Sequence, residues 1–261
     1  MTDNTTEEIK HCPFCDEEIR TKAVICKHCG QWMPGYSYES AIRDLVIQKQ
    51  VTEIEISSLE EDMKSREGQL KLALEWTVGS KLISFKGFDL SAQELKGVDL
   101  SGADLSESNL READLSGANL SETNFTRANL FRANLQGAKI RKANLSDAYM
   151  REVNLERADL SGSQLPRANL RGAYMDHAVL YRVDLEKANL KTVDLRFANL
   201  RESYLKETRF DGAKLEEVNL KGALLIRTDF SHADIEPHEY KNARQIESII
   251  LPNGETYNPP G

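Results

Sequence analysis

Four cysteines, all within residues 12–29, are the side chains of this sequence best suited to chemistry. They form two Cys-x-x-Cys pairs separated by ten residues, and Gly30 follows the second pair. Such pairs present four thiolates at a spacing that suits tetrahedral zinc, and four protein ligands leave no open position for catalysis. In a reducing compartment this pattern favours metal over disulfides. We predict one structural Zn²⁺ held by Cys12, Cys15, Cys26 and Cys29.

The segment that carries these cysteines, residues 1–34, is too short to bury a core, so zinc would take the place of one. The stretches CPFC, EEI and CKHCG resemble small bacterial zinc ribbons, and the four cysteines match the ligand positions of that type. A redox role for a Cys-x-x-Cys pair is the alternative, but no βαβ pattern surrounds the pairs.

Most of the remaining chain follows a strict period of five. From Leu90 to Ile235 all 30 residues at this spacing are apolar, 23 of them leucine. Two places earlier, the 28 residues from Val98 to Ala233 are alanine, valine, serine or threonine. Five residues rotate a helix by about 140° and flip the face of a straight strand, so neither keeps these residues on one side. A chain that turns every five residues does, and we predict an all-β solenoid.

Motifs such as ADLSG, ANLSE, ANLFR and ANLQG resemble the A(D/N)LXX unit of the pentapeptide repeat family. The resemblance covers 30 consecutive units and implies a right-handed quadrilateral β-helix with four units per coil. It implies no common catalytic activity. Members of the family are mostly binding or scaffold proteins, and one subgroup protects DNA gyrase by imitating duplex DNA.

We divide the chain into a zinc ribbon (1–34), a helical connector (35–84), the β-helix (85–235) and a C-terminal cap (236–261). In the connector, apolar residues fit heptad spacing, although Lys49, Thr52 and Arg66 interrupt the seam. One interpretation is an amphipathic helix that packs on the ribbon or on the first coil. The other is a coiled coil through residues 39–77, which would make a homo-oligomer.

The cap is predicted because a solenoid otherwise exposes backbone and leucine at its ends. Pro237 begins a short helical stretch, and Ile249 to Tyr257, with Asn253 and Gly254 at its centre, has the pattern of a β-hairpin.

Catalytic motifs are absent from the sequence, which has no GxSxG, HExxH, Walker or GxGxxG motif. The recurring Asp and Asn residues before the leucines are expected to hydrogen-bond along the coils rather than to act as acids or bases. We therefore expect no enzyme. No signal sequence and no run of 18 apolar residues is present, which indicates a cytoplasmic protein with no membrane span.

Residues 20 positions apart should share a side of the tube. One side collects acidic residues with Tyr174, His177 and Phe197 among them, and a neighbouring side aligns Arg111, Arg151, Arg171 and Lys191. Apolar residues at positions that the repeat keeps polar indicate a contact patch for a protein. The predicted partner-binding residues are Tyr174, Asp176, Asp194, Phe197, Tyr204, Leu224 and Ile226.

Two functions follow from these features. The first is a non-catalytic scaffold or adaptor that binds protein partners along a rigid β-helix. The second is a DNA-mimicking protection factor for DNA gyrase, which needs broad negative charge, whereas residues 90–235 hold 22 acidic and 21 basic side chains. The ribbon has few basic residues, so protein is expected to be its partner rather than nucleic acid.

Overall fold

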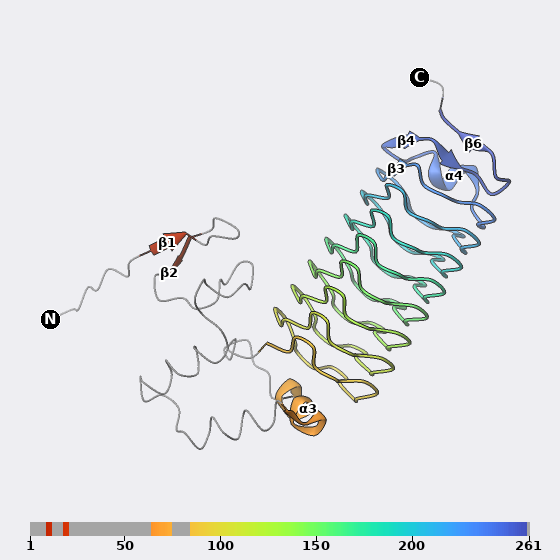
Figure 1. The fold of residues 1–261 in the computed structure, drawn as a ribbon. Helices are drawn as coiled ribbons and strands as arrows, with labels where there is room; N and C mark the ends of the chain where they lie inside the picture. The colour runs from red at the N-terminus through yellow and green to blue at the C-terminus, as the bar shows by residue number, and fades with distance from the viewer. Residues whose placement is uncertain (1–8, 12–17, 21–63, 75–83, 260–261) are drawn as a thin grey trace, which may run out of the picture.

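A four-sided tube of parallel coils occupies the larger part of the chain (Figure 1). The computed structural model describes residues 9–11, 18–20, 64–74 and 84–259. Parallel bridges join residues 20 apart, from Asp89 paired with Asn109 to Lys214 paired with Asp234, and each 20-residue coil contributes four of them. The predicted β-solenoid is therefore confirmed.

The four sides of the tube are named here by the core residues of the first coil. Side 1 carries Leu90, side 2 carries Leu95, side 3 carries Leu100 and side 4 carries Leu105. A residue 20 positions further along the chain lies on the same side, one coil nearer the C-terminus.

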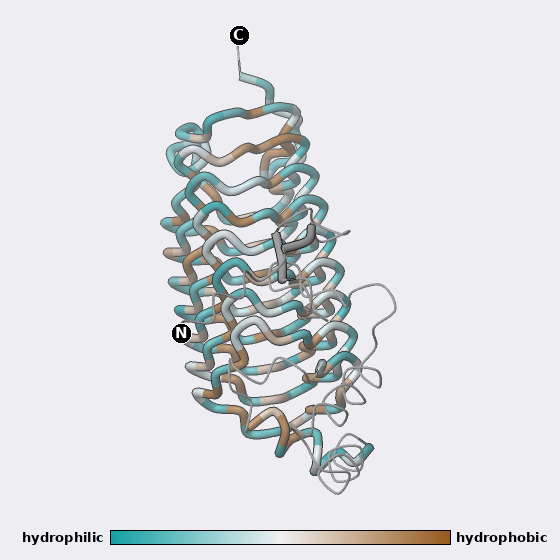
Figure 2. Tube along the Cα trace, turned by 90° about the vertical axis from the view of Figure 1, so that its left-hand side faces the viewer, coloured by the Kyte–Doolittle hydropathy of each residue, from teal (hydrophilic) through white to brown (hydrophobic). Residues whose placement is uncertain are grey.

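A column of apolar side chains fills the tube. Every fifth residue from Phe85 to Ile235 is at most 7% exposed, and the small residues two places earlier are also buried from Ala103 onward. Polar and apolar residues alternate along each coil instead of gathering on one side (Figure 2). Burial of each leucine contributes roughly 1.5–3 kcal/mol before the entropy of ordering the chain is subtracted.

The corners of the tube are turns with one residue in the left-handed region. All 30 residues that lie two places after a core residue, from Gly87 to His232, have positive φ. Nine of them are glycine, which tolerates this conformation, and the other 21 are not. Residues other than glycine therefore commonly adopt the left-handed conformation in this fold, and glycine occupies only some of the corners.

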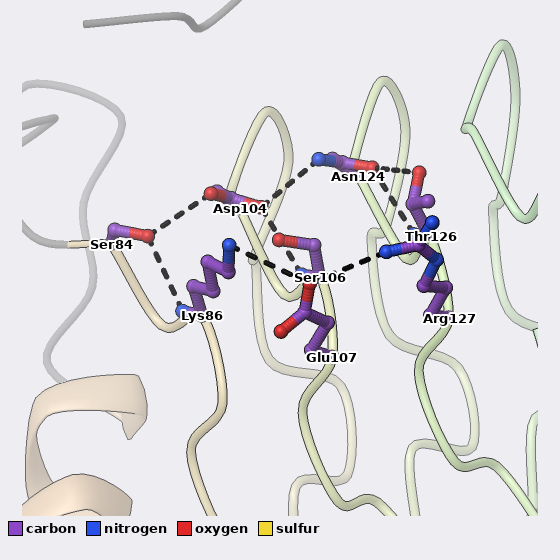
Figure 3. A network of polar contacts seen from close by, with 8 residues as sticks. All are labelled: Ser84, Lys86, Asp104, Ser106, Glu107, Asn124, Thr126 and Arg127. Carbon is purple, nitrogen blue, oxygen red and sulfur yellow. Dashed lines mark hydrogen bonds and ion pairs between the residues drawn. The ribbon is translucent and has the colours of Figure 1, made fainter.

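Polar ladders connect the coils outside the core, as Figure 3 shows for side 4. The Asn124 side-chain amide donates to Asp104 Oδ1 at 3.0 Å, and the backbone N–H of Ser106 donates to the same oxygen at 3.1 Å. Ser84 Oγ donates to the other oxygen of Asp104 at 3.0 Å. The Asp and Asn residues before the core positions thus stabilise turns and ladders, which confirms the role predicted for them.

Helix α3 (Arg66–Leu74) packs on the N-terminal end of the tube. Its Leu72 and Ala73 are buried in the same apolar cluster as the first coil. Gln69 Oε1 accepts a hydrogen bond of 2.7 Å from the backbone N–H of Asp89, so a side chain takes the place of a preceding coil. This segment agrees with a helix packed on the first coil. Residues 39–63, which hold most of the alternative coiled coil, lie outside the described residues.

One further coil closes the C-terminal end. Strand β3 (Leu224–Ile226) pairs in parallel with β4 (Gln245–Glu247), and helix α4 (Pro237–Tyr240) lies between them in sequence. Strands β5 (Ile249–Ile250) and β6 (Thr256–Tyr257) form an antiparallel hairpin. The rings of Tyr240 and Tyr257 meet edge to face with centroids 6.0 Å apart, so the hairpin covers the end of the core.

Near the N-terminus, β1 (Ile9–His11) pairs antiparallel with β2 (Glu18–Arg20). The four predicted zinc ligands, Cys12, Cys15, Cys26 and Cys29, lie outside the described residues. In the described part of the chain, no helix is long and apolar enough to cross a membrane.

Candidate interaction surface

Side 2 of the tube carries most of the excess negative charge. Its outward positions hold nine acidic side chains against four basic ones, whereas the other three sides are close to balance. The basic residues are Lys96, Arg157, Arg196 and Lys214. The acidic residues are Glu94, Asp114, Glu156, Asp176, Asp194, Glu216, Glu217, Asp234 and Glu236. We call this surface the acidic side.

Exposed aromatic rings lie within the acidic side. Tyr174 and Phe197 are 52% and 48% exposed, and they are two of the four large hydrophobic residues that are exposed in the described part of the chain. The His177 ring lies 5.0 Å from that of Phe197, one coil away. Asp176 Oδ2 contacts His177 Nδ1 at 2.8 Å. Four of the predicted partner-binding residues, Tyr174, Asp176, Asp194 and Phe197, are therefore brought together here.

Asp194 supplies a fixed negative charge beside these rings. The Arg196 guanidinium donates two hydrogen bonds of 2.8 Å to its carboxylate, and Lys214 lies 3.5 Å away. The hydrogen bonds from Arg196 outweigh the effect of burial and hold the pKa of the Asp194 carboxyl below its usual value. Asp194 is thus ionised at neutral pH but already engaged. Glu216, Glu217 and Asp234 have no ion pair among the described residues, so their charge is open to a partner.

Phe197 lies at a corner of the tube with φ of 58°, where the equivalent residues of the other coils, His177 apart, are glycine, arginine or glutamate. This backbone conformation is common to all corners of the coils, so it does not distinguish Phe197 from its neighbours. The ring is half exposed and packs against the His177 ring, so core packing does not account for it. An exposed ring of this size suits a contact with a partner.

The other three predicted partner-binding residues lie on a different side of the tube and are less exposed than expected. Tyr204, Leu224 and Ile226 are all on side 4 and are half-buried rather than exposed, and their role in partner binding stays a prediction. Half-burial is the usual state of these positions on side 4, because each coil is covered by the coils on either side of it. Strand β4 pairs with β3 at Leu224 and Ile226 as a further coil would.

One exposed aromatic residue escaped the sequence prediction. Tyr149 on side 1 is 39% exposed and lies 6.1 Å, between ring centroids, from Phe131 on the preceding coil. The sequence could have indicated this exposed ring, because Tyr149 replaces the Asp or Asn that normally precedes the core residue, as Tyr174 does.

The described residues form no candidate metal site. Residues 9–11, 18–20, 64–74 and 84–259 contain no group of three or more His, Cys, Asp or Glu side chains that could hold a metal ion. The acidic side offers charge and exposed rings, which suit binding of another molecule.

Known families and proteins of the same architecture are similar to this chain. The family model described as pentapeptide repeats matches in eight copies, over more than half of the chain. The matched residues are 84–111, 94–130, 108–147, 128–165, 154–191 and 203–236. No curated protein matches the chain.

Several solved structures are similar. HetL, a pentapeptide repeat protein involved in heterocyst differentiation regulation in the cyanobacterium Nostoc sp. strain PCC 7120, is 28% identical, with 67% of this chain and 87% of HetL covered and a TM-score of 0.48. QnrB1, a plasmid-mediated fluoroquinolone resistance protein, is 18% identical, with 65% and 86% covered and a TM-score of 0.41. A further pentapeptide repeat protein of Nostoc is 30% identical, with 42% and 84% covered and a TM-score of 0.28.

Proposed function

The chain belongs to the pentapeptide repeat family, and we propose that it is a non-catalytic scaffold or adaptor that binds a protein partner along its β-helix. The observation that carries the proposal is the pair of exposed rings, Tyr174 and Phe197, within the acidic side. Each coil is held by backbone hydrogen bonds to both neighbouring coils, so the backbone that carries these rings does not have to be ordered on binding.

The chemistry of the acidic side indicates the kind of partner. Carboxylates at Glu216, Glu217 and Asp234 attract Lys and Arg side chains, and the faces of Tyr174 and Phe197 can hold a cation by cation–π contact. We infer that the partner presents a basic segment. Because its charges meet an exposed surface, binding should weaken as salt rises above the physiological range.

Loss of the two rings should abolish partner capture. In the double variant Tyr174→Ser with Phe197→Gly, we expect at least a tenfold drop in the amount of partner captured from native cell lysate, measured by affinity capture with mass spectrometry. Phe197→Gly removes a ring from a left-handed corner, so the free energy of unfolding should stay unchanged or rise by up to about 1 kcal/mol. A loss of capture without a loss of stability would then report on the surface itself.

The matched control is Tyr181→Ser, an aromatic residue on side 3 whose hydroxyl donates to Glu202 at 3.1 Å. This variant should retain the partner. If the double variant captures the same protein in the same amount as the unmodified chain, the acidic side is not the docking surface and the proposal fails.

Gyrase protection is the alternative function, and the charge distribution weighs against it. Duplex DNA presents phosphates around its whole circumference, whereas excess negative charge in this tube is limited to one of four sides. A gyrase supercoiling assay with added fluoroquinolone separates the two functions. Protection that depends on protein concentration would favour the alternative over the adaptor.

A second part of the proposal concerns the N-terminal segment and the connector. We propose that Cys12, Cys15, Cys26 and Cys29 hold one structural zinc ion and that the ribbon so formed contacts protein, which the spacing of the two Cys-x-x-Cys pairs supports. Association of two copies through residues 39–77 is proposed on the heptad pattern of the connector.

A further inference from the structure

A ladder of cations and rings follows the corner between sides 1 and 2. The first residue after the core position of side 1 is, on five successive coils, Arg111, Phe131, Arg151, Arg171 and Lys191. Neighbouring members are one coil apart, which places their Cα atoms about 4.8 Å from each other. This spacing lets two adjacent side chains reach a single small ligand.

The cations at the two ends of the ladder are already engaged. Arg111 pairs with Glu112 at 2.8 Å, and Lys191 pairs with Asp211 at 2.7 Å. The guanidinium of Arg111 also lies over the Phe131 ring, 4.9 Å from its centroid. The positive charges at both ends of the ladder are therefore paired with carboxylates of the protein itself.

Arg151 and Arg171, at the centre of the ladder, differ from the others. The Arg171 side chain is exposed, and no described residue forms a hydrogen bond or an ion pair with its guanidinium. Arg151 has only a long contact of 3.8 Å with Glu152, whose carboxylate is instead bonded to Arg132 at 2.7 Å. Neither of these two adjacent guanidinium groups donates a hydrogen bond to a carboxylate among the described residues.

Arg151 is nevertheless held in place. Its Nη1 donates to the Tyr149 hydroxyl at 3.2 Å. Its Nε is buried and is the one buried side-chain nitrogen or oxygen without a hydrogen-bond partner in the part of the chain that the structure describes. A desolvated donor on a charged group is costly, and such exceptions call for an explanation such as a missing ligand. An anion bound by the other nitrogens of this guanidinium would offset part of the cost, because the positive charge is shared over the whole group.

We propose that Arg151 and Arg171 bind a phosphate monoester on a phosphorylated protein segment. A phosphate monoester carries a charge of about −1.5 to −2 at neutral pH and offers three acceptor oxygens to the planar donors of arginine. Gly172, which follows Arg171, has no side chain to block the approach. The site lies on a different edge from Phe197 and does not depend on the function proposed for the acidic side.

Nucleic acid fits this surface less well. A nucleic acid strand would extend along several coils, where it would meet Glu112 and Glu152 in the next column and the acidic side beyond them. A single compact dianion needs only the two central arginines. The observations therefore favour the phosphorylated segment.

The experiment uses the full chain and a rhodamine-labelled peptide Gly-Gly-phosphoserine-Gly-Gly, with binding measured by fluorescence anisotropy in 100 mM NaCl. The unphosphorylated peptide should bind at least tenfold more weakly. Arg151→Gln and Arg171→Gln should each weaken binding about tenfold. Glu152→Gln should tighten it two- to threefold, because it removes the nearest carboxylate, an effect that a purely structural role would not produce.

The matched control is Arg201→Gln on side 3, which also removes an exposed arginine that has no ion pair among the described residues. It should change the affinity less than twofold. An equal loss in this variant, or equal binding of the unphosphorylated peptide, would overturn the proposal. So would tighter binding of a labelled 20-nucleotide oligothymidylate that is lost in Arg151→Gln. If Arg151→Gln alters the thermal unfolding of the tube, Arg171→Gln, whose side chain has no described partner, decides the outcome.

Discussion

Replacing Leu160 with alanine is expected to lower the free energy of unfolding by about 3–5 kcal/mol. Leu160 is fully buried at the middle of the tube, between Ile140 and Leu180 on the neighbouring coils. Those coils cannot collapse into the space, because the backbone fixes their separation. The Leu160 N–H donates to Val179 at 2.8 Å, and the Asp159 N–H donates to Ala138 at 3.0 Å. The truncated side chain therefore leaves a cavity.

The measurement is guanidinium unfolding followed by circular dichroism. Since each coil contacts only its two neighbours, a central lesion should also reduce the cooperativity of the transition and lower its slope. The matched control is Leu74→Ala in helix α3, because Leu74 is 53% exposed, and its effect should stay within about 0.5 kcal/mol. A loss below 1 kcal/mol for Leu160→Ala would contradict the tight packing of the column.

The fold could be predicted from the sequence because each core position repeats one requirement. A leucine every fifth residue and a small residue two places before it satisfy only a chain that turns at that interval, so local pattern and global fold coincide. The identity of the corner residues was less informative. Glu107, Arg127 and Asp147 adopt the same left-handed conformation as the glycines, since the ladder of backbone hydrogen bonds imposes the turn whatever the side chain.

The side of the tube on which a residue lies could be predicted from the repeat, but the exposure of its side chain could not. A spacing of 20 residues placed Tyr174 and Phe197 together correctly on side 2. It also placed Leu224 and Ile226 together on side 4, but residues at these positions are half-buried on most coils, so their apolar character did not make them an exposed patch. The exposure of one side chain depends on its size and its direction, which a periodic pattern does not give.

The ion-pair partners of the surface arginines could not be predicted from the sequence either. The column of arginines is visible as Arg111, Arg151, Arg171 and Lys191, but the pattern does not say which of them are neutralised. That depends on side-chain geometry, in which Glu112 and Asp211 engage the ends of the column and Glu152 turns to Arg132. The two arginines that donate no hydrogen bond to a carboxylate, Arg151 and Arg171, were identified only once these distances were known.

Removal of zinc is the change with the largest expected effect, because structural zinc contributes roughly 10–16 kcal/mol of apparent binding free energy in comparable peptides. We expect elemental analysis of protein purified under reducing conditions to give one zinc ion per chain. The double variant Cys12→Ser with Cys15→Ser should lose that zinc, and limited proteolysis should then cleave within residues 1–34. The thermal midpoint of the β-helix should not change, since helix α3 and the C-terminal coil cover the two ends of its core.

The control for zinc uses the two histidines beside the cysteines. His11→Ala and His28→Ala should each retain one zinc ion, because the four thiolates complete a tetrahedral shell and leave no position for imidazole. Addition of a thiol-reactive reagent should release the ion, and a colorimetric chelator can follow that release. A chain that holds no zinc, or one whose zinc survives replacement of both Cys26 and Cys29 by serine, would rule out the four-cysteine site. In that case residues 1–34 would need another source of stability, because a segment of this length cannot bury a core of its own.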